Sequence, residues 1–139
     1  MSDVSSRFRD FLLADENINR LVGGRVHEDH VPQRLGAKDL PYIWYRLRQQ
    51  SGAETLDSSN GEGAKFHYFD VEVVAGKATS TVKDLATFVR ARCSCYRGTY
   101  GDSTCQGIFV DDRGDEYERR NGGGDEGWSI PAFDVRVIT

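Results

Sequence analysis

The sequence predicts an α+β fold, with a single small and mainly antiparallel sheet, two helices packed on one face and long hairpin loops. Two segments repeat apolar residues with the helical period, at positions 5–22 and 80–93. Four segments alternate apolar and polar residues as strands do: 42–50, 65–75, 106–117 and 128–138. Two glycine-rich polar stretches, 51–64 and 118–127, connect these strands in pairs. Since neither stretch can supply a crossover helix, we expect the connected strands to be antiparallel.

The first predicted helix has one apolar face, which only Asp15 interrupts. That face consists of Phe8, Phe11, Leu12, Ile18, Leu21 and Val22. Ser5 or Ser6 can cap the start of this helix, and Gly23 tolerates the left-handed conformation that ends many helices. The residues that follow, 25–27, favour a short strand.

The next predicted strands each have one face suited to a core. In segment 42–50 that face holds Ile43, Tyr45 and Leu47, and the opposite face begins aromatic and ends cationic. In segment 65–75 it holds His67, Phe69, Val71 and Val73. The second helix begins at Ser80 or Thr81, and the last strand alternates Phe133, Val135 and Val137 with polar residues.

Length and composition limit the possible classes of protein. The chain has 139 residues, which fits one domain spanning residues 1–139, and its net charge of −4 gives no support to nonspecific duplex binding. Its apolar runs are far shorter than the roughly 20 residues of a membrane helix, and no secretion signal follows the first ten residues. An odd set of cysteines, Cys93, Cys95 and Cys105, favours a reduced, cytoplasmic compartment.

Common enzyme motifs are missing from the sequence. It has no Gly-x-Ser-x-Gly elbow, no phosphate-binding loop and no His-Glu-x-x-His. The possible zinc ligands His27, His30, His67, Cys93 and Cys95 lack the usual ligand spacing, and the acidic run that starts at Asp111 has Gly122 where a calcium loop needs a closing Glu. We therefore expect neither a cofactor nor catalysis. One enzymatic alternative stays open, a metal-dependent nuclease that uses Asp70 and Glu72.

The two glycine-rich stretches are the most distinctive feature. Stretch 51–64 has almost no apolar residue besides Leu56, and 118–127 has no aliphatic residue. Loops of this length are usually functional or disordered. We interpret both as contact arms, while disordered hairpin tips are an alternative that is compatible with ordering on binding.

A series of short motifs adds a family resemblance over residues 8–137. The motifs occur in this order: Leu21-Val22-Gly23-Gly24-Arg25-Val26, Leu40-Pro41-Tyr42-Ile43-Trp44-Tyr45, Thr55-Leu56-Asp57, Phe69-Asp70-Val71-Glu72-Val73, Tyr96-Arg97-Gly98, Gln106-Gly107-Ile108-Phe109, Asp111-Asp112 and Phe133-Asp134-Val135-Arg136-Val137. In this order the sequence resembles the tail completion, or tail terminator, proteins of long-tailed bacteriophages. The Cys93-Ser94-Cys95 segment departs from the pattern.

The resemblance implies a structural role and no catalytic residue. It implies a homo-oligomer, a ring of six copies that docks on the head-proximal end of the tail tube. The ring would stop polymerisation of the major tail tube protein and bind the head-tail connector protein, in the virion tail after assembly in the host cytoplasm. DNA would pass through without specific binding, in agreement with the acidic net charge. A related connector protein, the stopper or adaptor between portal and tail, is the closest alternative.

In a closed ring, one surface patch of each subunit binds a different patch of the next subunit. We expect oppositely charged side chains to meet at this interface. The candidate interface residues are Arg46, Arg48, Leu56, Asp57, Arg90, Asp111, Asp112, Asp115, Glu116 and Glu118. In this interpretation, acids near Asp111 and Asp112 contact Arg46, Arg48 or Arg90 of the neighbouring subunit.

Overall fold

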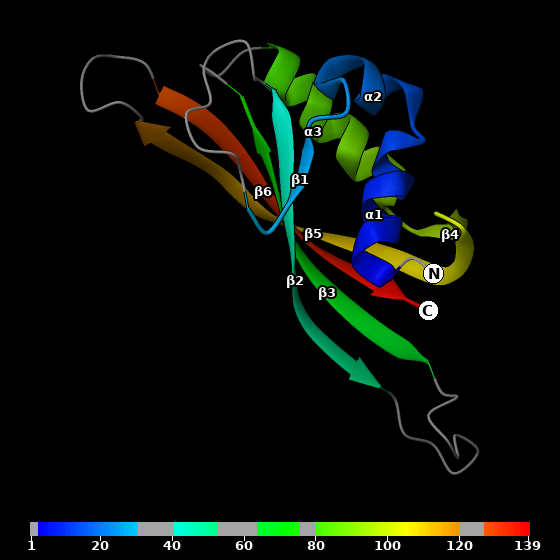
Figure 1. The fold of residues 1–139 in the computed structure, drawn as a ribbon. Helices are drawn as coiled ribbons and strands as arrows, with labels where there is room; N and C mark the ends of the chain where they lie inside the picture. Colours follow the sequence, from blue (N-terminus) through cyan, green and yellow to red (C-terminus); the bar gives the residue numbers. More distant parts are fainter. Residues whose placement is uncertain (1–2, 31–40, 53–63, 76–79, 120–126) are drawn as a thin grey trace.

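The computed structural model describes residues 3–30, 41–52, 64–75, 80–119 and 127–139. These ranges contain three helices, α1 (Val4–Leu13), α2 (Glu16–Val22) and α3 (Ser80–Cys93). They also contain six strands: β1 (Val26–Glu28), β2 (Tyr42–Gly52), β3 (Lys65–Val74), β4 (Tyr96–Tyr100), β5 (Ser103–Arg119) and β6 (Gly127–Ile138). The helices lie next to one another beside a strongly curled sheet (Figure 1). The α+β class is therefore confirmed.

All six strands belong to one mixed sheet with the order β1-β2-β3-β6-β5-β4. The β2–β3, β3–β6, β5–β6 and β4–β5 pairs are antiparallel, and β1 runs parallel to β2. The two long hairpins are thus antiparallel, as predicted. The short β4 was not predicted, and the parallel β1 makes the sheet mixed. Most of both predicted loops, residues 53–63 and 120–126, lies outside the described residues.

The single helix expected over residues 5–22 is two helices, because Asp15 caps a new one. Its carboxylate Oδ1 accepts hydrogen bonds from the backbone N–H groups of Asn17 (2.9 Å) and Ile18 (3.1 Å). The start of α1 was also predicted wrongly: Asp3 is the N-cap and accepts from the Ser6 N–H at 2.7 Å. At the end of α2, Gly23 is left-handed with φ 56°, as expected.

The core forms where apolar residues of the helices meet one side of the sheet strands. Phe8 of α1 is fully buried, and its ring centre lies 4.7 Å from that of Phe69 in β3 and 5.2 Å from that of Tyr45 in β2. Leu85 and Val89 of α3 belong to the same buried cluster. The alternating residues of β2, β3 and β6 therefore supply a common apolar side, and their polar residues point to the opposite side.

The α3 helix ends with the Cys93-Ser94-Cys95 segment. Cys93 is fully buried in the core cluster, and the Ser94 N–H donates to the Arg90 carbonyl at 2.8 Å. Cys95 has a positive φ of 54°, so it ends the helix in the left-handed conformation that glycine usually supplies. The residues that depart from the family pattern thus form a helix terminus.

A candidate assembly interface

A row of charged residues crosses the side of the sheet opposite the core. The strand register aligns Arg46 of β2, Asp70 of β3, Asp134 of β6 and Asp111 of β5. Three of these four adjacent residues are aspartates, and like charges directly opposite one another destabilise a sheet. We call these four residues the charged row.

Arginines neutralise one end of the charged row. Arg46 Nη2 lies 3.0 Å from Asp70 Oδ2, and Arg48 Nη1 lies 3.6 Å from Asp70 Oδ1 and 3.9 Å from Asp134 Oδ1. The Asp70 side chain is only 7% exposed, whereas those of Arg46 and Arg48 are about half exposed, at 53% and 46%. Asp70 therefore depends on these two arginines for compensation of a buried charge.

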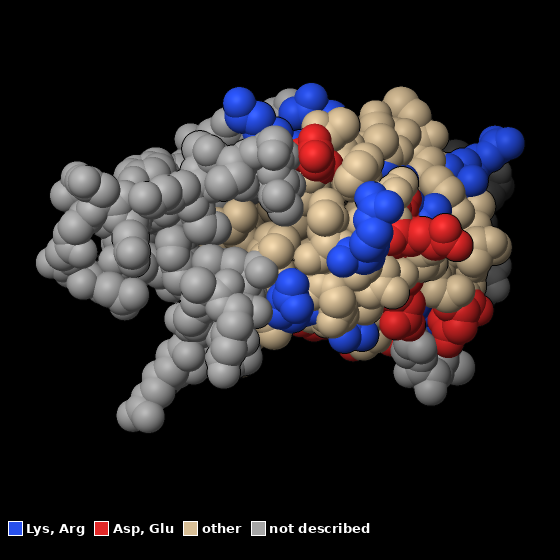
Figure 2. Space-filling model, turned by 90° about the horizontal axis from the view of Figure 1, so that it is seen from above, with Lys and Arg blue, Asp and Glu red and all other residues tan. Residues whose placement is uncertain are grey.

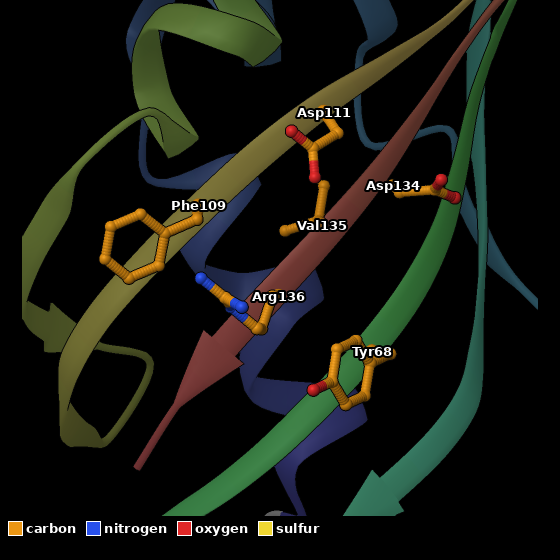
Figure 3. Close-up of a pocket in the computed structure, with 6 residues that line it drawn as sticks. All are labelled: Tyr68, Phe109, Asp111, Asp134, Val135 and Arg136. Atoms are coloured by element: carbon orange, nitrogen blue, oxygen red, sulfur yellow. The ribbon is translucent and has the colours of Figure 1, made fainter.

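The β5 end of the charged row is open. Asp111 is exposed, and among the described residues none forms an ion pair with it. It lines a shallow pocket of about 60 Å³ together with Tyr68, Phe109, Asp134, Val135 and Arg136 (Figure 3). Arg136 extends toward Phe109, with its guanidinium carbon 5.0 Å from the ring centre. At 41% exposure, Phe109 is the exposed large hydrophobic residue of the described part of the chain.

Only some of the predicted interface residues come together. Arg46, Arg48 and Asp111 share the polar side of the sheet, and both arginines already pair with Asp70 in the same chain. Arg90 lies apart from them on α3, with its guanidinium carbon 5.8 Å from the Phe133 ring centre. The predicted acids Asp112, Asp115, Glu116 and Glu118 follow Asp111 along β5. Leu56 and Asp57 lie outside the described residues.

Sequence reasoning missed three members of this surface. Asp134 and Phe109 were noticed only as parts of motifs, and Asp70 only as part of a motif and as a possible metal ligand. Asp70 alternates with the apolar Phe69 and Val71, a pattern typical of a solvated strand face, but the residue is only 5% exposed. The register between β3 and β6 determines that Asp70 faces Asp134, and one sequence does not fix that register.

The described residues offer little for metal or thiol chemistry. No group of three or more His, Cys, Asp or Glu residues among them is arranged to hold a metal ion. Burial raises the pKa of Cys93 to about 12 and also raises the pKa of Cys105, so both thiols stay protonated near neutral pH. No helix in the described ranges is long and apolar enough to cross a membrane.

Basic and acidic side chains are interspersed over the surface seen from above (Figure 2). Among the described residues visible in that view, they do not form the continuous basic field that binds nucleic acid phosphates. The fold and the charged row define the class of the protein as a small α+β protein with charged side chains on one side of its sheet.

Comparison with known proteins identifies the family. The family model of tail completion protein gp17 matches residues 7–124, so the chain belongs to this family of tail completion proteins. It is a structural protein and not an enzyme, which sets the nuclease alternative aside. No curated protein matches the chain.

Two solved structures are similar to this chain. A chain from the virion of a native gene transfer agent particle is 19% identical over 100% of both chains, with a TM-score of 0.57. A second solved protein is 13% identical over 97% of this chain and 89% of the other, with a TM-score of 0.47. The first likeness supports the fold described above.

Proposed function

We propose that this chain forms a ring, of six copies, on the head-proximal end of a phage tail tube. The ring ends polymerisation of the tube protein and joins the tail to the head connector. Membership of the tail completion family is the observation that carries this proposal. The matching fold of a gene transfer agent chain is consistent with a place in the virion.

The polar side of the sheet is suited to this role. In this proposal the chain is a single domain, and its three helices cover one face of the sheet. The opposite face and both edges of the sheet then remain for contacts. There, the charged row and the exposed Phe109 offer polar and aromatic groups to a neighbouring protein. An acidic subunit with a net charge of −4 also lets DNA pass without gripping its phosphates.

Growth of tail tubes in vitro tests the proposal. Purified chain is added to polymerising tube protein from the same phage, and tube lengths are measured by electron microscopy. We expect elongation to stop and a ring to be visible at one end of each tube. Bovine serum albumin at equal concentration is the control. Tubes that elongate equally with the chain and with the control would contradict the proposal.

The same material separates a terminator from a connector stopper. A terminator binds preformed tubes in a pull-down, whereas a stopper or adaptor binds the portal-side proteins and leaves free tubes alone. Binding to the portal-side proteins alone would replace the terminator by the connector alternative.

A further inference from the structure

The outer strands of the sheet, β1 and β4, are shorter than the strands beside them, β2 and β5. Each therefore pairs with only part of its neighbour. β1 pairs only with residues 43–45 of β2, and β4 pairs only with the first part of β5, up to Ile108. No strand in the described ranges pairs with the outer side of β2 over residues 46–52, or of β5 over residues 109–119. We call these segments the β2 edge and the β5 edge. Uncovered edges of this length are templates for pairing with another chain.

The backbone of the β2 edge offers hydrogen bonds to a further strand. Lys65 and Thr139 exchange both backbone hydrogen bonds, at 3.0 and 2.9 Å, so the peptide groups of Lys65 point away from β2. Gly52, which is opposite Lys65, therefore directs its own N–H and C=O outward. By alternation Gln50 does the same, whereas Gln49 points back to β3.

The two edges carry opposite charge. The β2 edge contains Arg46 and Arg48 and no acid. The β5 edge contains five acids, Asp111, Asp112, Asp115, Glu116 and Glu118, against two arginines, Arg113 and Arg119. Two β5 edges repel one another, because each has an excess of acids. The β5 edge is instead attracted to Arg46 and Arg48, which stay about half exposed although they pair with Asp70 in their own chain. Charge therefore favours the heterologous contact over a symmetric β5–β5 contact.

The strand directions fit such a contact. Three successive antiparallel pairings lead from β2 through β3 and β6 to β5, so β5 is antiparallel to β2. In a head-to-tail array, β5 of one copy then lies antiparallel to β2 of the next. Since β1 covers the start of β2 and β4 covers the start of β5, the free halves lie at opposite ends of the sheet. A shift of several residues along the strands brings them together and keeps β1 and β4 clear.

We propose that successive copies of this chain join edge to edge, with the β2 edge of one copy pairing antiparallel with the β5 edge of the next. The inference rests on the proposed ring and names its subunit contact. Main-chain hydrogen bonds supply the pairing, as in strand addition, and the opposite charges set its polarity. The shift that keeps β1 and β4 clear places Gln49 opposite Glu116 of the neighbouring copy.

Disulfide formation between two different variants, each with one introduced cysteine, tests the pairing, because the remaining Cys93 and Cys105 are buried. In a Cys95→Ser background, full-length Gln49→Cys protein is mixed with Gly114→Cys, Glu116→Cys or Glu118→Cys protein and oxidised. In the proposed pairing, Gln49 and these three positions of β5 would form non-hydrogen-bonded pairs. The Cα atoms of such a pair are about 4.5 Å apart, a distance at which disulfides form readily. We expect cross-linked dimers in the mixtures, strongest with Glu116→Cys, and none from either variant alone. Thr104→Cys, in the β5 part that β4 covers, is the matched control.

A backbone substitution gives a second readout. Gln50→Pro removes the backbone N–H that points outward from β2. We expect the dissociation constant for self-association, measured by sedimentation, to rise roughly tenfold, which corresponds to the loss of one hydrogen bond. Gln50→Ala loses the same side chain and keeps the N–H, so its association should match the wild type. Equal weakening by both variants would overturn the edge pairing.

The outcomes separate the edge pairing from the proposed function. Rings seen by electron microscopy without any cross-link at the three positions would overturn the pairing and leave tube termination standing. Absence of both rings and cross-links at high protein concentration would also overturn the pairing. Cross-linked copies that do not stop tube growth would support the pairing and contradict termination.

Discussion

At the residue scale, two buried tyrosine hydroxyls hold the start of α1 on the sheet. Tyr100 donates to the Val4 carbonyl at 2.7 Å, and Tyr45 donates to the Ser5 carbonyl at the same distance. Both tyrosines are fully buried, and burial raises the pKa of each phenol, so both remain donors across the physiological range. These bonds join two buried residues at the start of α1 to β4 and β2.

The first prediction concerns Tyr100. Tyr100→Phe removes the buried hydroxyl that donates to the Val4 carbonyl, and we expect a loss of about 1–2 kcal/mol in the free energy of unfolding, measured in urea. Tyr96→Phe is the matched control, since its hydroxyl donates to the Thr99 carbonyl at an exposed site. Its substitution should cost less than about 0.5 kcal/mol. Equal losses for both variants would contradict the account of the buried bond.

His67 links the ends of two strands to the last residue of the chain. Its Nδ1 lies 3.1 Å from Gln50 Nε2, and its Nε2 lies 3.0 Å from Thr139 Oγ1. An amide nitrogen can only donate, so Nδ1 accepts and the neutral ring is the form that fits. Burial, with a smaller effect of Lys65, lowers the pKa of His67 below its usual 6.5.

The second prediction is a pH dependence. Because the folded pKa is lowered, the unfolded chain binds the proton more readily. Stability is therefore fully present above about pH 6.5 and falls as the pH drops from there to the folded pKa. Urea unfolding at several pH values should show this fall in the wild type and a smaller fall in His67→Gln. His30→Gln, at an exposed histidine, should keep the wild-type dependence. An unchanged slope in His67→Gln would show that His67 is not responsible.

At the element scale, local capping decides where the first two helices end. The apolar period runs through residues 5–22 almost unbroken, and it predicts the buried residues Phe8, Phe11 and Ile18 correctly. It cannot show that the Asp15 carboxylate starts a new helix, because a period is equally compatible with one helix or two. β4 was missed for a different reason: its less exposed positions alternate, but Gly98 stands between Tyr96 and Tyr100 on that side, so the sequence shows no continuous apolar alternation.

The third prediction tests the cap of α2. Asp15→Ala removes the acceptor for two backbone N–H groups and should cost about 1 kcal/mol of unfolding free energy. Asp15→Asn keeps an acceptor oxygen and should cost only a few tenths of that amount. Urea denaturation measures both. A continuous helix across residue 15 would instead gain stability from alanine, which is the better helix former.

At the scale of the whole molecule, the register of the sheet determines which charged residues become neighbours. The sequence alone did not reveal these neighbours. The alternation of β3 predicts the buried Phe69, Val71 and Val73 but not the buried Asp70, and the alignment of Asp70, Asp134 and Asp111 depends on long-range pairing. The interface residues named from the sequence, Arg46, Arg48, Arg90 and Asp111 among them, stay predictions, because a single chain shows no contact between subunits. Within the chain, Arg46, Arg48 and Asp111 lie on the polar side of the sheet and Arg90 lies on α3.

The fourth prediction concerns the core that joins the helices to the sheet. Phe8 is fully buried against Phe11, Tyr45 and Phe69. Phe8→Ala should therefore cost about 3–5 kcal/mol, and a domain of marginal stability would unfold in large part. Phe109→Ala, at the exposed phenylalanine, is the control and should cost less than about 1 kcal/mol. Circular dichroism during heating distinguishes the two variants. A folded Phe8→Ala protein with nearly wild-type stability would contradict this description of the core.

Tail length in a phage whose copy of this gene is disrupted tests the central claim most directly. We predict overlong tails of variable length, detached from filled heads, in electron micrographs of the lysate. Supplying the intact chain from a plasmid should restore normal length and joining. Tails of normal length attached to filled heads in the disrupted phage would contradict the account.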